Sequence, residues 1–276
     1  MNPHAKQPTS LFSLGKTIWI HRKLIKKMAW REVASRYKGS ILGLLWSFIN
    51  PILMLIVYTF VFSIVFQAKW GVVAGESKTN FALILFVGLT IHGLLAEVLN
   101  RSPGLILSNV NYVKKVVFPL DVLPVITLMA ALFHSSISII VLLIASVALN
   151  GDLPWTVIFI PLVIFPLATL VIGVAWMLAA LGVFVRDIGQ TIGIITTMML
   201  FMAPVFFPLS AVPEKYHPFI LSNPLTFIIE QAREVLIFGR VPNWSGLAIY
   251  MLIAFGIAWL GYAFFQKTRK GFNDVL

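Results

Sequence analysis

The feature that most constrains this chain is a set of apolar runs that are each long enough to cross a bilayer. Residues 122–149 are the clearest case, because none of these positions carries Asp, Glu, Lys or Arg. A helix crosses the hydrocarbon core with about 20 apolar residues. In the whole chain 59% of residues are hydrophobic and only 11% are charged, against roughly 25% charged residues in soluble domains. We therefore expect an integral membrane protein.

Six runs of this kind predict six membrane-spanning helices within one all-α transmembrane domain, residues 1–276. Membrane β-strands are a poor alternative, because they alternate apolar and polar residues over about ten positions, whereas these runs are apolar on all sides. Prolines inside the runs are tolerated in membrane helices. The expected spans are residues 41–66, 81–99, 122–149, 155–185, 188–207 and 244–265.

Basic residues gather on one side of these expected spans. Residues 1–40 hold nine Lys and Arg side chains, with Glu32 as the only acid among them. Cytoplasmic segments of membrane proteins carry an excess of Lys and Arg. The distribution therefore places both termini in the cytoplasm, which agrees with an even number of spans. It also accounts for the net charge of +11 without a nucleic acid as partner.

Residues 10–33 predict an amphipathic helix in front of the first span. Such a helix lies in the headgroup region, with its apolar face in the membrane and its basic residues on anionic lipid. It could serve only as a topology determinant and lipid anchor, or it could also form a docking surface for a cytoplasmic partner. Its apolar residues at helical spacing are Leu11, Leu14, Ile18, Ile25 and Met28.

Two connections between spans are too apolar to be simple loops. Residues 102–119 predict a short helix over 108–115 lying across the cytoplasmic face and ending before Phe118-Pro119. A plain basic loop is the alternative. Residues 209–239 contain short apolar stretches of the kind that form re-entrant or interfacial helices. They are a candidate external gate, with plain interfacial packing as the alternative.

Residues that could carry catalysis are sparse. Glu97 and Arg101 suit a structural i,i+4 pair, and His134, followed by serines, suits hydrogen bonding between helices. Scattered histidines do not make a metal site, and the lack of cysteine excludes disulfides. Residues 14–17 look like the end of a phosphate-binding loop, but Ser10 stands where that loop needs glycine. We therefore expect no enzymatic activity and no cofactor or metal in this chain.

Aromatic side chains are plentiful, with 22 Phe, 8 Trp and 6 Tyr. Lipid contact and interfacial belts account for most of them. The alternative is a sugar path, because sugar rings pack their apolar C–H faces on aromatic rings. Composition does not choose between the two. The candidate path residues on the first and fifth spans are Trp46, Tyr58, Phe62, Phe66, Phe201, Phe206 and Phe207.

Four motifs follow one another in the order found in a known family. The first runs from Arg36 to Trp46 and continues to Asn50-Pro51, and the second covers residues 111–119. The third is Val185-Arg186-Asp187-Ile188, and the fourth covers residues 216–239 with Asn223-Pro224-Leu225 and Arg233. Together they resemble the ABC-2 permeases that export O-antigen, capsule and teichoic acid, and the likeness covers essentially the whole chain.

The resemblance implies a six-span permease that works as a homodimer with two copies of a separate ATPase subunit, which binds ATP and magnesium. Residues 10–33 would be an interface helix beside the ATPase, and residues 209–239 would be re-entrant gate helices. Residues 102–119, which we name the coupling segment, would contain the coupling helix that fits a groove on the ATPase. A lipid-linked glycan would leave across the bacterial inner membrane along the first and fifth spans. The residues implied for coupling to the ATPase are Asn109, Tyr112, Lys114, Lys115, Phe118, Arg186 and Asp187, and those implied for the gate are Asn223 and Arg233.

The N-terminus and Ser40-Ile41-Leu42-Gly43 look more like the O-antigen permeases of Gram-negative bacteria than like teichoic-acid exporters. Capsule or teichoic-acid export remains the alternative, followed by a small-molecule ABC-2 permease, which the short external loops disfavour. A proton-driven carrier is disfavoured because no acid lies in the middle of an expected span. A membrane enzyme is disfavoured by the lack of acid or histidine clusters.

Overall fold

The computed structural model describes residues 11–66, 70, 78–114 and 118–276. Among these residues it contains helices and turns but no β-strand, as the sequence predicts. The α-helices are α1 (Leu11–Ser35), α2 (Trp46–Tyr58), α3 (Lys78–Arg101), α4 (Val110–Lys114), α5 (Val122–Asn150), α6 (Ile160–Phe184), α7 (Ile188–Phe201), α8 (His217–Leu221), α9 (Pro224–Leu236), α10 (Trp244–Thr268) and α11 (Phe272–Val275). A π-helical stretch, Thr59–Val65, continues α2, and short 3₁₀ turns lie at Gly43–Leu45, Ser102–Gly104, Leu107–Asn109, Trp155–Phe159, Leu209–Ala211, Glu214–Tyr216 and Arg269–Gly271.

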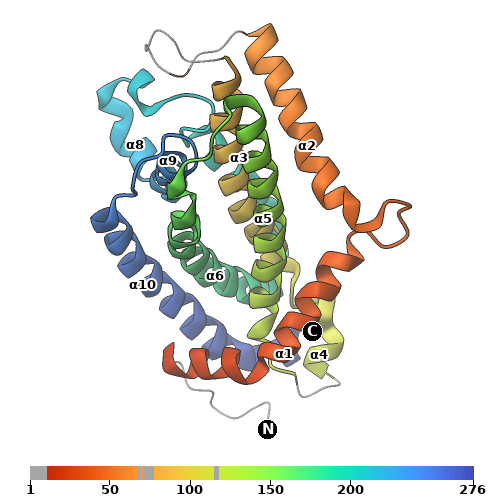
Figure 1. Cartoon of the computed structure of the whole chain (residues 1–276). Helices are drawn as coiled ribbons and strands as arrows, with labels where there is room; N and C mark the ends of the chain where they lie inside the picture. Colours follow the sequence, from red (N-terminus) through yellow and green to blue (C-terminus); the bar gives the residue numbers. More distant parts are fainter. Residues whose placement is uncertain (1–10, 67–69, 71–77, 115–117) are drawn as a thin grey trace.

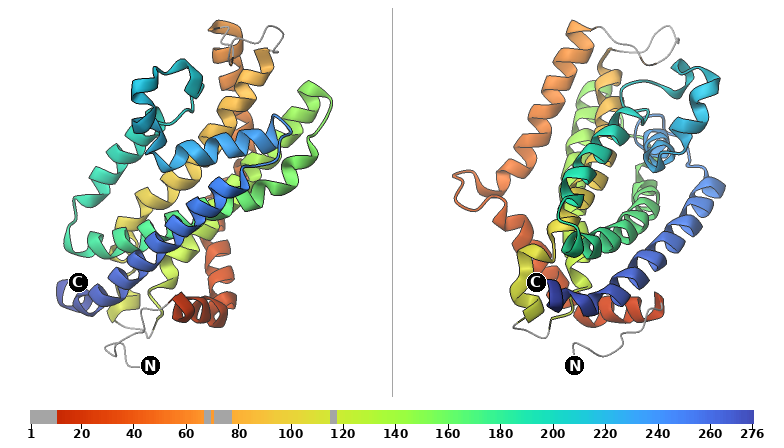
Figure 2. Two further views of the ribbon diagram at one scale, coloured as in Figure 1. Left: turned by 90° about the vertical axis from the view of Figure 1, so that its left-hand side faces the viewer. Right: turned by 180° about the vertical axis from the view of Figure 1, so that it is seen from behind.

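The long helices form a bundle with two distinct ends. Helices α3, α5 and α6 lie centrally, while α2 and α10 stand at opposite edges, as Figures 1 and 2 show from both sides. Helices α1 and α4 lie with the C-terminus at one end, which we call the lower end (Figure 1). Helices α8 and α9 lie at the other, upper end. The helices predicted at residues 10–33 and 108–115 therefore lie at the lower end, and those predicted within residues 209–239 lie at the upper end.

Within the described residues, five helical stretches are long and apolar enough to cross a membrane. They correspond to the first, second, third, fourth and sixth predicted spans. Gly151, with a φ of 86°, ends the third of them in the left-handed conformation that glycine adopts readily. The five stretches are Gly43–Val65, Phe81–Gly104, Val122–Asn150, Trp155–Phe184 and Trp244–Gly271.

The helix at the predicted fifth span, residues 188–207, is shorter than expected. Helix α7 has 14 residues, which is roughly 21 Å at 1.5 Å per residue, less than the hydrocarbon core of about 30 Å. It ends at Phe201, and residues 202–207 form turns and bends. Pro204 explains this end, because proline lacks the N–H that a helix needs and disfavours helical backbone at the preceding residue.

Helices α1, α8 and α9 lie close to where the sequence predicts helices outside the spans. Helix α1 covers the predicted 10–33 and extends to Ser35, although Ser10 lies outside the described residues. Helices α8 and α9 lie on either side of Asn223-Pro224. The Asn223 side chain accepts a hydrogen bond from the N–H of Leu225 at 3.0 Å, and Pro224 occupies the first helical position. Both are residues that favour a helix start.

Helices α6 and α10 pack with their backbones almost in contact. A Cβ placed on Gly173 would lie 2.6 Å from the Cα of Ala258, and one on Gly261 would overlap the carbonyl group of Gly173. The Trp176 ring meets the Tyr262 ring edge-on at 5.4 Å. Small residues at such crossings let membrane helices approach closely and gain van der Waals contact. The two helices therefore form one closely packed unit, the α6–α10 block.

Helix α2 is bound to the rest of the bundle more loosely. In the apolar window of Gly43–Val65 only 11% of residues are buried, against 67% for Phe81–Gly104. Exposed apolar side chains follow its length, including Ile52, Leu53 and Ile56. A face of this kind fits contact with lipid or with another protein chain.

Candidate functional site

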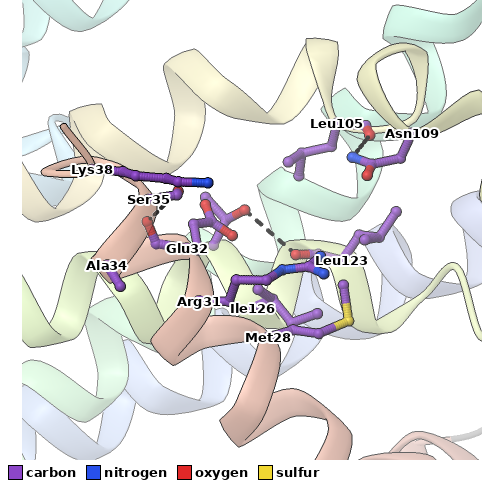
Figure 3. Close-up of a pocket in the computed structure, with 11 residues that line it drawn as sticks. Met28, Arg31, Glu32, Ala34, Ser35, Lys38, Leu105, Asn109, Leu123 and Ile126 are labelled. Atoms are coloured by element: carbon purple, nitrogen blue, oxygen red, sulfur yellow. Dashed lines mark hydrogen bonds between the residues drawn. The ribbon is translucent and has the colours of Figure 1, made fainter.

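A groove lies at the lower end, where α1 crosses α5 and the first part of the coupling segment. Its volume is about 540 Å³. Figure 3 shows side chains from these three segments converging on it, with Arg31 and Glu32 close to its centre. The groove is lined by Met28, Arg31, Glu32, Ala34, Ser35, Lys38, Leu105, Asn109, Leu123, Ile126 and Thr127.

A chain of ionic contacts holds α1 against α3 and α5 beside this groove. The carboxylate of Glu97 lies 2.9 Å from Nη1 of Arg36 and 3.6 Å from Nη1 of Arg101. Nδ1 of His134, on α5, lies 3.1 Å from the same carboxylate. Arg101 also pairs with Glu32 of α1. The predicted Glu97–Arg101 pair and the predicted hydrogen bonding of His134 between helices are therefore both confirmed.

The Glu32 carboxylate is the acidic group of the groove. Burial raises its pKa above the ordinary value, while the nearby Arg101 guanidinium lowers it. Loss of solvent therefore outweighs the attraction of the arginine at this carboxylate. Because Arg101 is 42% exposed, the pair adds little to stability. Its clearer effect is geometric, since it fixes the orientation of α1 across α3.

Three of the predicted coupling residues lie together beside the groove. The side chain of Asn109 lines it and donates to the carbonyl of Leu105 at 2.9 Å. The Tyr112 ring stacks on the Phe118 ring with centroids 4.4 Å apart. Nη2 of Arg31 donates to the Tyr112 hydroxyl at 3.3 Å, which connects α1 to the coupling segment.

The remaining coupling candidates are placed less closely. Lys114 ends α4, as a short helix at this position predicts, whereas Lys115 lies outside the described residues. Arg186 and Asp187 are exposed in the turn between α6 and α7. The carbonyl of Asp187 accepts the N–H of Thr191 at 3.2 Å and so starts α7. Two residues further on, a Cβ on Gly189 would lie 3.9 Å from Pro103. The turn is therefore next to the start of the coupling segment.

Most of the predicted path aromatics gather around the upper end of α2. The Phe62 ring lies 5.8 Å from Phe66, 5.7 Å from Phe81 and 6.4 Å from Phe206. The Phe201 ring stacks on Phe206 at 5.6 Å. Such distances are typical of aromatic pairs that attract one another. The first and fifth predicted spans are thus joined by an aromatic cluster, which we define as Phe62, Phe66, Phe81, Phe201 and Phe206.

The other path candidates lie apart from this cluster or at its margin. Trp46 stands at the start of α2, the opposite end of that helix. Tyr58 lines a separate cleft of about 320 Å³ between α2, α3 and α5, together with polar side chains such as Asn50 and Ser138. Phe207 is half-buried in the bend after α7. The structure therefore does not bring all seven aromatic candidates together.

The two gate candidates both anchor α9. Asn223 donates to the carbonyl of Met199 on α7 at 2.9 Å. The Arg233 side chain is fully buried, and its guanidinium lies 4.2 Å from the Trp70 ring centroid. It donates to the carbonyls of Ile84, Pro204 and Val205 and to the Glu230 carboxylate, at 3.2, 2.6, 3.1 and 2.7 Å.

Arg233 remains charged although its side chain is fully buried. Burial lowers its pKa to about 10, while Glu230 opposes that change. The side chain therefore carries a full positive charge at neutral pH, and its attraction to the three carbonyls is charge-assisted. Arg233 thus holds α9 against α3 and against the turn after α7.

Sequence reasoning missed how many groups converge on Glu97. It treated Glu97 as half of a local pair, although the partners Arg36 and His134 come from 61 and 37 positions away. One signal could have found them. Ionisable groups near the ends of apolar runs are costly to leave alone, so acids and bases at similar depth on neighbouring spans are expected to meet. Among the described residues, no group of three or more His, Cys, Asp or Glu is placed to hold a metal ion.

The chain is similar to known membrane transport proteins. A family model for ABC-2 type transporters matches residues 23–237. An O-antigen export system permease protein RfbA of Myxococcus xanthus is 26% identical over 96% of this chain and all of its own length. One from Klebsiella pneumoniae is 27% identical over 89% of this chain and 92% of its own. The polysialic acid transport protein KpsM of Escherichia coli is 23% identical over 91% and 95%. The match to most of its length shows that the chain belongs to the ABC-2 type transporter family.

Proposed function

We propose that this chain is the permease subunit of an ATP-driven exporter that moves lipid-linked polysaccharide, in the first place O-antigen, outward across the bacterial inner membrane. The observation that carries the proposal is the similarity, over 89–96% of the chain, to permeases named for O-antigen export. Capsule export is the second candidate, favoured by the 23% identity to the polysialic acid transporter KpsM.

A strain that lacks this chain tests the proposal in cells. We expect the surface polysaccharide to disappear and its lipid-linked form to accumulate on the cytoplasmic side of the inner membrane. Restoring the gene should reverse both effects, which controls for damage to neighbouring genes. Surface polysaccharide at the wild-type level in the deletion strain, with no internal accumulation, would contradict the proposal.

We further propose six membrane crossings with both termini in the cytoplasm. The excess of Lys and Arg in residues 1–40 supports this orientation. So does the position of α1 and the C-terminus at one end of the bundle (Figure 1). Helix α7 would be a crossing completed by the turns at 202–207, with α8 and α9 re-entering the membrane above it. Irregular backbone is acceptable at that depth when protein covers it, as the buried Ile228 and Ile229 of α9 suggest.

Single cysteines placed in this cysteine-free chain test the orientation. Lys16, Lys215 and Lys267 are all exposed and lie on α1, before α8 and at the end of α10. We expect Lys16→Cys and Lys267→Cys to react with a membrane-impermeant maleimide only after the membrane is opened. Lys215→Cys should react in intact spheroplasts, and the parent chain should remain unlabelled. Labelling of Lys215→Cys only from the cytoplasm would refute the arrangement.

The lower end is the proposed docking region for the ATPase subunit, which would bind ATP and magnesium. The groove combines the charged side chains of Arg31, Glu32 and Lys38 with apolar ones, and the aromatic pair Tyr112 and Phe118 adjoins it. The exposed basic side chains Lys23, Lys26 and Lys27 of α1 lie on the same end and would contact anionic lipid or the ATPase. Motion imposed on the coupling segment by the ATPase would then reach α1 through Arg31 and Tyr112.

The upper end is the proposed exit for the glycan. The aromatic cluster offers ring faces to sugar C–H groups, and α9, held by Arg233, would form the gate above it. Two copies of the chain would enclose the path between them. The apolar, exposed faces of α2 and α7 support such a homodimer, with Ile56 and Met198 among the exposed side chains.

A further inference from the structure

One buried carboxylate at the exit of the coupling segment is reached from several elements. Asp121 directly precedes α5 and is 4% exposed. Its Oδ2 lies 3.4 Å from Nε2 of Gln266, and its Oδ1 lies 4.0 Å from Nη1 of Arg269. The indole N–H of Trp176 donates to its backbone carbonyl at 2.9 Å. Groups from α6, α10 and the turn after α10 therefore meet at this residue.

Arg269 holds the coupling segment as well as Asp121. Its Nη2 donates to the carbonyl of Phe118 at 3.2 Å. The Phe118 ring in turn stacks on Tyr112, whose hydroxyl faces α1. The Arg269 guanidinium, directly after α10, thus contacts both Phe118 of the coupling segment and Asp121, the residue that precedes α5.

The beginning of the coupling segment meets the same block of helices. A Cβ on Gly182 of α6 would overlap the carbonyl of Pro103, so the α6 backbone lies directly on the 3₁₀ turn Ser102–Gly104. The α6–α10 block also extends downward through Phe272, which is fully buried against Phe265 and Phe184 at ring distances of 5.5 and 6.0 Å. Both described ends of the coupling segment therefore contact the α6–α10 block or the turn that follows it.

Stability alone is a weak reason for placing a carboxylate here. Burial raises the pKa of Asp121 above its ordinary value even though Arg269 lowers it. The loss of hydration thus destabilises the charged carboxylate more than its attraction to Arg269 stabilises it. Buried ion pairs of this kind can often be replaced by neutral groups without loss of stability, while they can fix one specific arrangement.

We propose that Asp121 and Arg269 are positioning residues that fasten the exit of the coupling segment to the α6–α10 block. A movement of the coupling segment then displaces these helices as well, because the contacts between them are fixed. Pro103 on Gly182 supplies the second attachment, so the segment and the block move as one body. The inference rests on the proposed function, because it concerns how an ATPase would drive transport.

The test uses the full-length permease with its ATPase in proteoliposomes that contain lipid-linked polysaccharide. The variants are Asp121→Asn, Arg269→Gln, Arg269→Lys and the double variant D121N/R269Q, with Lys270→Gln as an exposed neighbouring control. ATP hydrolysis, glycan export and the melting temperature are measured for each. We expect D121N and R269Q to reduce glycan exported per ATP hydrolysed by about tenfold, with hydrolysis within about twofold of wild type.

Three further results follow if the two residues act through each other. The double variant should be no worse than the more impaired single variant. Arg269→Lys should retain part of the coupling, and Lys270→Gln should match wild type. Unchanged export per ATP in D121N and R269Q would overturn the inference. A loss of export would also overturn the inference if ATP hydrolysis, assembly with the ATPase or the melting temperature decreased in parallel. Failure of the wild-type complex to export glycan would instead overturn the proposed function, and this inference with it.

Discussion

Replacing Arg233 with alanine is expected to lower the free energy of unfolding of the permease by about 3–5 kcal/mol, the range observed when one partner of a buried ionic contact is removed. The side chain is fully buried and makes four hydrogen bonds. Its removal would leave the carbonyls of Ile84, Pro204 and Val205 without this donor. Each buried acceptor left unpaired costs about 1–3 kcal/mol, and the contact with Trp70 is lost as well.

Arg240→Ala provides a matched control four positions after the end of α9. Arg240 is also an arginine paired with a glutamate, at 3.6 Å from Glu234, but its side chain is 72% exposed. Exposed pairs are typically worth less than about 1 kcal/mol, so its loss should hardly change the melting temperature in detergent. Arg233→Lys should fall between the two, because lysine keeps the charge but not the fork of donors. Equal melting temperatures for R233A and R240A would show that Arg233 does not hold α9 in place.

Replacing Gly261 with valine is expected to destabilise the permease by about 3 kcal/mol, the upper range for overpacking. The new Cβ would overlap the carbonyl group of Gly173, which belongs to the α6 backbone and cannot rotate away as a side chain can. The α6–α10 block would have to separate, and with it the support of the coupling segment. We therefore expect a lower melting temperature together with reduced export.

Gly256→Val on the same helix is the control for this change. A Cβ at Gly256 would meet no heavy atom within 4 Å among the described residues that surround it. The substitution carries the same change in backbone freedom and side-chain volume, so it should alter stability by no more than about 0.5 kcal/mol. If both valine variants melt at the same temperature as wild type, the close packing of α6 on α10 is not required.

The sequence was sufficient to predict the elements of the fold that depend on local pattern. The charge-free run at residues 122–149 corresponds to α5, Val122–Asn150. The break at Asn223-Pro224 separates α8 from α9 because asparagine caps a helix and proline starts one. The early end of α7 could have been predicted as well, since Pro204 stands inside the apolar run at 188–207.

The contacts that hold the candidate site together could not be predicted in this way. Arg233 looks like one of a few basic residues in an external connection, yet it reaches carbonyls 29 and 149 positions away. Asp121 looks like a boundary residue, but it meets Gln266 from 145 positions away. Such partners depend on how helices pack against one another, and the periodicity of one segment contains no information about a distant one.

Export of lipid-linked polysaccharide by this chain, driven by an ATPase subunit, is the function we propose. The most direct measurement uses proteoliposomes containing the purified permease, its ATPase and lipid-linked glycan on the ATPase side. We expect glycan to cross to the opposite side only with ATP and magnesium, and omission of either subunit to abolish the transfer. Crossing at the same rate without ATP, or ATP hydrolysis by the complete complex with no movement of glycan, would contradict it.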